Sequence, residues 1–177
     1  MNRILEIMDE LRNIEYGFKD KNGANLINSE SWDKNFYNFY YLLSPEELLH
    51  SKCGVCWDQV ELERKLFNDA NINCDTYFIY IDDNENLPSH TFLIFQLNDK
   101  YYWFEHSWEI FKGIHEYNTL KELLLDVRDK FISVELHNDY KKLFLLLHEY
   151  TKPKYHIGTQ EFFNHCDFGA YIDFDEL

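Results

Sequence analysis

Two apolar segments separated by a short polar turn constrain the fold of this chain more than any other feature. Residues 90–97 and 100–107 are rich in aromatic and branched side chains, and the Asn-Asp pair at 98–99 favours a tight hairpin turn between them. A third β-type segment, residues 74–82, precedes them. The middle segment is apolar on both faces over residues 91–95, as in a strand covered on both sides. The sequence therefore predicts an antiparallel meander of three strands.

The register of this hairpin brings two chemically active side chains onto one face. With a two-residue turn at 98–99, His90 lies opposite Ser107 and diagonal to Glu105. Because side chains alternate along a strand, His90 and Glu105 share a face, whereas His106 points to the other. Diagonal neighbours have Cα atoms roughly 7–8 Å apart, so a long carboxylate reaches an imidazole nitrogen. The alternative for this carboxylate is a structural salt bridge with Arg64 or Lys100.

A helix is predicted over residues 54–71, where good helix formers follow a glycine. Its periodicity places Cys56 on the same side as Val60 and Phe67, so the thiol points inward at the first turn. The helix dipole and the free backbone N–H groups at that end favour an anion and could hold an oxyanion. Considered alone, a buried cysteine is more often a packing residue. Glu63 falls near the same side, and the sequence offers no account of it.

The remaining segments complete an α+β fold. Further helices are predicted over residues 1–14, 45–52 and 118–131 and from 159, with Ser44 and Thr159 as caps, and a strand over 143–147. The aromatic run at 32–43 is helical or irregular, and a turn falls near Gly113. We expect a single domain over residues 1–177, which comprises N-terminal helices in 1–52, a core in 53–108, a completing helix and strand in 109–166, and a solvated acidic tail in 167–177.

The charge of the chain excludes several partners. It has 177 residues, with 17 Lys and Arg against 32 Asp and Glu, and a formal net charge of −15. With 45% hydrophobic residues, so acidic a chain still buries enough area to fold. Its charge repels phosphate, so we expect neither nucleic acid nor a membrane surface as partner. Without a signal-peptide pattern, and with four cysteines, we expect a cytoplasmic protein with reduced thiols.

Three short motifs occur in a characteristic order. Gly-Val-Cys-Trp at 54–57 opens a helix, Ser-His-Thr at 89–91 begins a strand, and Tyr-Trp-Phe-Glu at 102–105 ends the next strand. Over about residues 52–108, this order resembles the core of the transglutaminase-like superfamily of papain-fold thiol enzymes. The resemblance implies a papain-like or transglutaminase-like core, in which the cysteine-bearing helix packs on the antiparallel meander and further helices flank it.

The resemblance also assigns roles to residues. Cys56 would be the nucleophile, His90 the base and later the acid, and Glu105 the residue that orients His90. Two departures from the family are a Glu where it generally has Asp, and the lack of a clear side-chain counterpart for the second oxyanion donor. Trp57, Trp103 and Trp108 flank the three residues, where they would exclude water and contact substrate.

The implied chemistry is acyl transfer from an amide. The thiolate of Cys56 would attack a peptide or protein amide, and the acyl group would pass to water, as in a peptidase or deamidase, or to an amine, as in a transglutaminase. A neutral or basic substrate suits the acidic chain better than an anionic one. Neither a cofactor nor a metal is implied, and the sequence leaves the oligomeric state open.

Other classes of protein fit parts of the pattern. An inactive binding module would keep the fold and use surface rings for peptide recognition; the candidate rings are Trp32, Tyr37, Tyr40, Tyr41, Trp57 and Trp108. Cys53 and Cys56 have the spacing of a redox dithiol, although a capped helix and not a strand precedes them. Cys53, Cys56, Cys74 and His90 could form a zinc site, although the second pair lacks close spacing.

Overall fold

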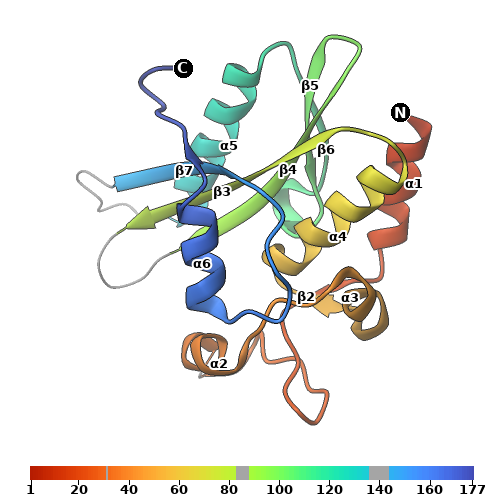
Figure 1. Cartoon of the computed structure of the whole chain (residues 1–177), viewed down its shortest axis with the longest axis vertical. Helices are drawn as coiled ribbons and strands as arrows, with labels where there is room; N and C mark the ends of the chain where they lie inside the picture. Colours follow the sequence, from red (N-terminus) through yellow and green to blue (C-terminus); the bar gives the residue numbers. More distant parts are fainter. Residues whose placement is uncertain (31, 83–87, 136–143) are drawn as a thin grey trace.

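The computed structural model describes residues 1–30, 32–82, 88–135 and 144–177 (Figure 1). Its helices are α1 (Asn2–Leu11), α2 (Trp32–Phe39), α3 (Pro45–Ser51), α4 (Cys56–Asp69), the 3-10 turn η1 (Glu109–Phe111), α5 (Leu120–Glu135) and α6 (Thr159–Asp167). Its strands are β1 (Glu15–Tyr16), β2 (Cys53–Gly54), β3 (Cys74–Asp82), β4 (Ser89–Leu97), β5 (Lys100–Glu105), β6 (Gly113–Tyr117), β7 (Phe144–Tyr150) and β8 (Ala170–Tyr171).

The predicted meander forms the centre of a six-stranded antiparallel sheet, whose order is β6-β5-β4-β3-β7-β8. Helices α1, α4 and α6 cover one face, and α5 covers the other (Figure 1). Two layers of helix around one sheet give both faces a place to bury their apolar side chains. The fold is therefore α+β, as the sequence predicts.

The hairpin between β4 and β5 has the predicted register. Asn98 and Asp99 both adopt positive φ, 51° and 59°, as a type I′ turn requires, and Leu97 pairs with Lys100. Asn and Asp tolerate this left-handed conformation better than most residues. Because the turn contains two residues, the ladder continues through Leu93 and Phe104 without a slip. The paired side chains of residues 93–97 and 100–104 thus take their predicted faces, whereas β5 ends at Glu105 and the ladder stops short of the predicted pair His90 and Ser107.

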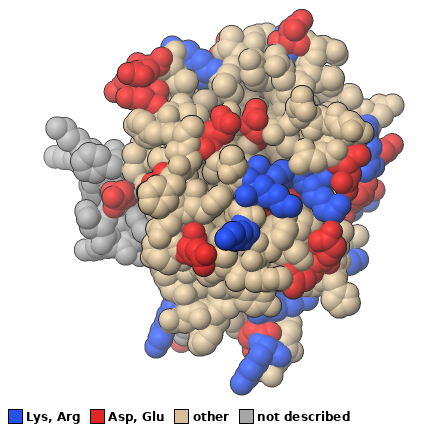
Figure 2. All heavy atoms as spheres, in the orientation of Figure 1, with Lys and Arg blue, Asp and Glu red and all other residues tan. Residues whose placement is uncertain are grey.

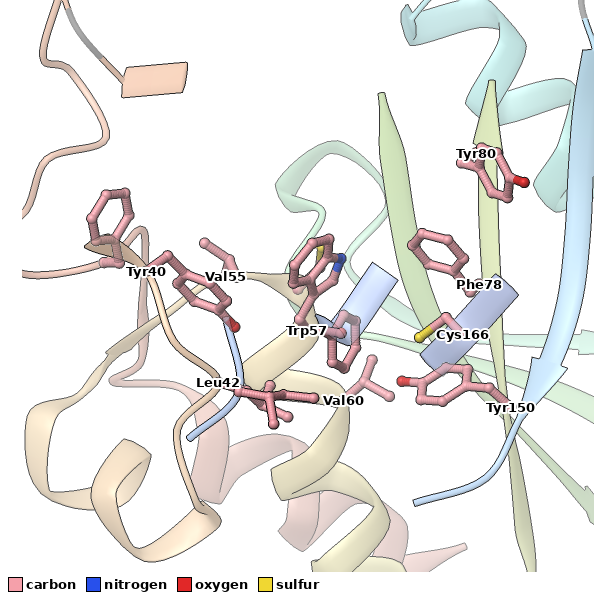
Figure 3. Packing of buried hydrophobic residues seen from close by; sticks show 13 residues of the cluster. Tyr40, Leu42, Val55, Trp57, Val60, Phe78, Tyr80, Tyr150 and Cys166 are labelled. Carbon is pink, nitrogen blue, oxygen red and sulfur yellow. The ribbon is translucent and has the colours of Figure 1, made fainter. Parts of the chain in front are cut away.

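The aromatic residues form much of the core between α4, α6 and the sheet (Figure 3). Trp57 stacks on Phe162 of α6 with ring centroids 4.4 Å apart, and Phe36 and Tyr40 contact its edges. Burial of each such ring contributes roughly 1.5–3 kcal/mol to folding. This is how an acidic chain gains enough stability to fold.

Several segments differ from the prediction. The turn expected near Gly113 is the start of β6, whose half-buried residues give a weak strand signal. Helix α6 begins at Thr159 as expected, but Gly158 is its N-cap and Thr159 donates its side-chain hydrogen bond to the Tyr37 carbonyl. Ser44 does cap α3, in a capping box with Glu47. The strand expected at 143–147 is confirmed from Phe144, and residue 143 lies outside the described residues.

The acidic C-terminal segment is not a solvated tail. Its residues Ala170 and Tyr171 form β8, which pairs with β7 at the edge of the sheet. Ile172, Phe174 and Leu177 then pack against the cluster between the sheet and α5. These apolar residues alternate with the acidic ones, so the backbone binds the sheet while the carboxylates face water.

The surface carries small groups of both signs, with basic side chains between acidic ones on the face seen in Figure 2. Among the described residues, no helix is long and apolar enough to cross a membrane.

Candidate active site

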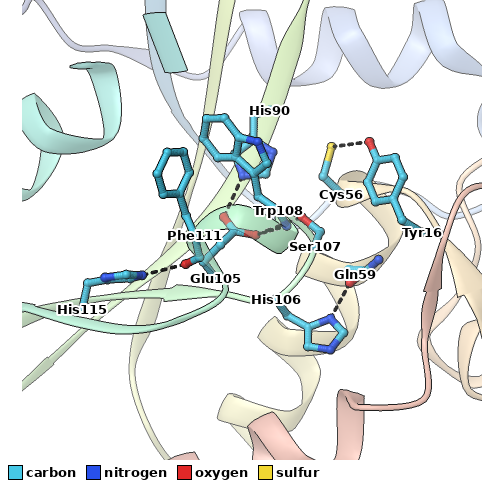
Figure 4. Close-up of polar contacts among 10 residues, drawn as sticks. All are labelled: Tyr16, Cys56, Gln59, His90, Glu105, His106, Ser107, Trp108, Phe111 and His115. Carbon is cyan, nitrogen blue, oxygen red and sulfur yellow. Dashed lines mark hydrogen bonds and ion pairs between the residues drawn. The ribbon is translucent and has the colours of Figure 1, made fainter. Parts of the chain in front are cut away.

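The His90 and Glu105 side chains meet as the hairpin register predicts. The His90 Nε2 atom lies 2.8 Å from Glu105 Oε2, and the two residues are only 7% and 2% exposed (Figure 4). Burial favours a neutral ring, but the Glu105 charge and hydrogen bonds with Cys56 and Glu105 outweigh it and raise the pKa of His90 to about 10. The pair therefore holds an imidazolium at neutral pH.

The Glu105 carboxylate is fixed by three donors. Oε2 binds His90, and Oε1 accepts hydrogen bonds from the Ser107 hydroxyl at 3.0 Å and the Trp108 backbone N–H at 2.8 Å. Burial alone would raise the pKa of this carboxyl, yet the charge of His90 and these hydrogen bonds hold it below its usual value. A carboxylate that accepts three hydrogen bonds stays ionised even when it is buried away from water.

The alternative salt bridges of Glu105 do not form. Arg64 instead contacts Glu61 at 3.1 Å, and Lys100 lies against Asn118 and Glu116. The carboxylate is thus free of any competing cation within the described chain, and its one ionic partner is His90.

Cys56 is the first residue of α4 and is 4% exposed. Asp58, two residues further on, holds the segment that precedes α4 in place. Its carboxylate accepts hydrogen bonds from the Val55 N–H at 2.9 Å, the Leu43 N–H at 2.8 Å and the Tyr40 hydroxyl at 2.9 Å. Burial, opposed by these hydrogen bonds, raises the pKa of Asp58 to about 7. The position of the thiol is therefore set by contacts from the chain before it.

A second clamp links the helix entry to the end of β5. The Gln59 side chain donates to the Gly54 carbonyl at 2.8 Å and accepts from the His106 ring, with 2.6 Å between Oε1 and Nδ1 (Figure 4). His106 points away from Glu105, as strand alternation predicts. Burial and then the Lys112 charge lower the pKa of His106 to about 4, so the ring is neutral. The clamp joins the segment that enters α4 to the strand that carries Glu105.

The cysteine and the histidine come from opposite sides of the sheet. Phe92 and Ile94, which share the face of His90, pack toward α5, whereas Cys56 belongs to the cluster on the α4 face. His90 is the second residue of β4, and its interaction with Cys56 is one of the causes that raise the pKa of the His90 ring. The structure thus pairs His90 directly with Glu105 and places Cys56 near enough to influence the pKa of His90.

The three tryptophans lie in different environments. Trp57 and Trp103 are 4% and 0% exposed, and both are packed in core clusters, so neither is accessible to a substrate in this conformation. Trp108 is half-buried, and its ring centroid lies 4.8 Å from that of His90. Of the surface rings expected for peptide recognition, Tyr40 is also buried. Trp57 is enclosed because the first two turns of α4 are buried all round, which reflects a central helix and not a surface one.

Sequence reasoning missed Tyr16 beside the site, and it placed Glu63 on the inward side of the helix without giving it a role. The Tyr16 hydroxyl donates to Cys56 Sγ across 3.9 Å, and no local pattern connects residues 40 positions apart. Glu63 is buried, its Oε2 has no partner among the described residues, and burial followed by the Glu105 charge raises its pKa well above the usual value. Its inward position on the helix was the available signal.

The other cysteines differ from Cys56 in environment. All four thiols are free, and burial raises the pKa of Cys53 to about 11 and that of Cys74 to about 12. In the parts of the chain that the structure describes, no three His, Cys, Asp or Glu side chains are grouped to hold a metal ion. The four residues of the alternative zinc set therefore do not converge.

A cysteine at the start of a helix, with a histidine and an acidic residue on adjacent antiparallel strands, is the arrangement of papain-fold thiol proteins. A family model described as a transglutaminase-like domain matches residues 1–134, which are 134 of the 177 residues. The chain belongs to this transglutaminase-like family. The match extends on both sides of the motifs at 52–108 and includes the N-terminal helices that enclose α4. A search of curated proteins finds no significant match.

Proposed function

We propose that this protein is a thiol enzyme that transfers an acyl group from an amide through Cys56, His90 and Glu105. One observation carries the proposal. His90 and Glu105 form a buried ion pair at 2.8 Å, and the His90 ring also interacts with Cys56, which lies at a helix N-terminus. A buried ion pair adds little to stability by itself, because desolvation offsets the attraction. Groups with such shifted pKa values, gathered around a nucleophile, are typical of active sites.

The chemistry follows from these positions. The imidazolium of His90 and the first turn of α4 favour a Cys56 thiolate, which adds to the carbonyl carbon while the C=O electron pair moves to oxygen. When the tetrahedral intermediate collapses, the C–N bond breaks and His90 donates its proton to the leaving amine. Water or a second amine, deprotonated by His90, then displaces the thiolate. Glu105 keeps the ring oriented throughout.

The substrate we propose is a neutral or basic peptide or protein amide. The net charge of −15 attracts cations and repels phosphate-rich partners. Trp108, half-buried against His90, is the ring best placed to contact it.

Selective alkylation tests the proposal. At pH 7, iodoacetamide should modify Cys56 at least about tenfold faster than Cys53, Cys74 or Cys166, because the latter three are held as thiols by burial. Peptide mapping by mass spectrometry gives the four rates.

The His90→Ala variant should slow the modification of Cys56 and leave the other three rates unchanged. His156→Ala is the matched control, because His156 also binds a glutamate, Glu47 at 2.7 Å, on the exposed surface. Equal rates at all accessible cysteines would favour a catalytically inactive peptide-binding module of the same fold and would contradict the enzyme.

A further inference from the structure

Tyr16 is held beside the nucleophile by a short parallel pairing. Strand β1 pairs with β2, so that Tyr16 lies opposite Gly54, two residues before Cys56. Backbone hydrogen bonds from Glu15 N–H to the Lys52 carbonyl, 2.9 Å, and from Gly17 N–H to the Gly54 carbonyl, 3.3 Å, fix both ends of this pairing. The segment that carries Tyr16 is therefore attached to the segment that enters α4.

The Tyr16 hydroxyl faces the reactive end of Cys56. It donates to Sγ across 3.9 Å, a long contact even for sulfur (Figure 4). Burial of the hydroxyl and then the charge of the sulfur keep its pKa well above the usual value, while the Cys56 backbone N–H opposes the rise. The phenol thus keeps its proton, and its hydroxyl lies beside the Cys56 sulfur.

The sulfur and the backbone N–H of Cys56 define where an oxyanion would form. When the thiolate adds to a carbonyl, the negative charge moves from sulfur to an oxygen bound to the same carbon, and the nucleophile's own N–H is its first donor. A donor that contacts sulfur weakly in the ground state and oxygen closely in the transition state accelerates the reaction, because only the difference between the two states counts. The long Tyr16–Cys56 contact satisfies this condition.

We propose that the Tyr16 hydroxyl is the second oxyanion donor, acting beside the Cys56 N–H. The inference rests on the proposed function. Tyr16 gives a hydrogen bond and keeps its proton throughout. The S–C bond forms as the C=O electron pair moves to oxygen; the pair then re-forms the C=O bond while the bond to the leaving group breaks, and the leaving group departs with a proton from His90, which leaves the acyl group on sulfur. Tyr16 is 40% exposed as a residue, so its side chain has room to move as the substrate oxygen enters.

Two reagents separate this role from others. An acyl donor such as p-nitrophenyl acetate reacts through an oxyanion, whereas iodoacetamide alkylates the same sulfur without one. Tyr16→Phe should lower the rate of Cys56 acylation by about 100-fold, as the loss of one oxyanion donor does, and change alkylation by less than about threefold. Mass spectrometry of the Cys56 peptide measures both rates.

The matched control is Tyr150→Phe. This variant also removes a tyrosine hydroxyl, one that is buried and donates at 3.3 Å to Glu61 on α4, the helix that begins with Cys56. It should leave both rates unchanged, and thermal unfolding should show that both variants fold. Acylation that is unchanged or faster in Tyr16→Phe would overturn the inference, as would an equal fall in both rates, which would mean that Tyr16 acts on the thiol alone. Wild-type protein that forms no acyl-Cys56 would instead overturn the proposed function and this inference with it.

Discussion

The two halves of the candidate site are built in opposite ways. His90 and Glu105 lie on long neighbouring strands, where one hairpin turn sets their relation and each is within 15 positions of the other. Cys56 lies where a helix begins, and its position depends on the hydrogen bonds of Asp58 with Tyr40 and Leu43, on that of Gln59 with His106, and on the two-residue pairing of β1 with β2. The strand half is thus fixed by local geometry, and the helix half by contacts with residues far away in the sequence.

This difference predicts two kinds of mutational effect. Substitutions in the strand half should change the reactivity of the site but leave the fold intact. The backbone hydrogen bonds between the strands hold them in place even when these side chains are replaced. Changes in the helix half should alter stability first and reactivity as a consequence. The following four variants test this division, from the largest expected effect to the smallest.

Glu105→Gln should have the largest effect of the four variants, and that effect should be on the reaction rate of Cys56. Loss of the carboxylate removes the charge that holds the His90 proton, so the pKa of His90 should fall from about 10 to a value near or below 6.5, since burial then dominates. Acylation of Cys56 at pH 7 should slow by about 1,000-fold, which corresponds to about 4 kcal/mol. NMR titration of the ring and the acylation rate provide the two measurements.

The same variant carries a stability signature. A raised His90 pKa stabilises the fold fully below pH 6.5, and this contribution is lost as the pH rises through about 10. The difference in unfolding free energy between wild type and Glu105→Gln should therefore shrink from pH 6 to pH 10. Glu47→Gln, at the exposed His156 pair, is the control and should not change acylation. A pH-independent difference would contradict the ion pair.

Asp58→Ala should have the largest effect on stability. It leaves the Val55 and Leu43 N–H groups and the Tyr40 hydroxyl without their acceptor, and each such loss costs roughly 1–3 kcal/mol, so we expect at least about 3 kcal/mol. Urea denaturation measures it. Asp69→Ala, at the exposed end of the same helix, should stay within about 0.5 kcal/mol of wild type. Similar losses in both variants would refute the anchoring role of Asp58.

Gly54→Ala should disturb the helix half sterically. A Cβ at this position would lie 2.5 Å from Leu48 Cδ1 and 2.8 Å from Asp58 Cβ, so the entry to α4 must shift, at a cost of about 1–3 kcal/mol. Alkylation of Cys56 should slow in parallel. Gly158→Ala serves as control, because its Cβ would approach nothing closer than 4.0 Å. Wild-type stability in Gly54→Ala would show that the helix entry is less constrained than its packing indicates.

His106→Gln should have the smallest effect, because the glutamine amide can still donate to Gln59. At pH 7 we expect a loss of about 1 kcal/mol or less. The lowered pKa of His106 means that the unfolded chain takes up a proton below pH 6.5 and the folded chain only near pH 4, so wild-type stability falls across that range. The variant should lose part of this acid sensitivity in thermal unfolding between pH 7 and 4. Unaltered acid sensitivity would argue against a buried neutral ring.

The sequence predicted the strand half because its signals are local. Alternation and a two-residue turn suffice to place His90 and Glu105 on one face, and the Cys56 position follows from helical periodicity. The neighbours of Cys56 were not predictable in this way. The pairing of Tyr16 with Gly54 is too short to have a pattern, and the burial of Trp57 depends on elements that enclose α4 from every side.

Strand β8 has a consequence for the behaviour of the protein at high concentration. The outer edge of β7 would otherwise present unpaired N–H and C=O groups beside apolar side chains, a surface that recruits strands from other molecules. Ala170 and Tyr171, with the Ile172 N–H that binds the Leu147 carbonyl at 2.9 Å, occupy part of that edge, and the carboxylates at 173, 175 and 176 surround it with negative charge. We therefore expect the acidic C-terminal segment to oppose edge-to-edge aggregation.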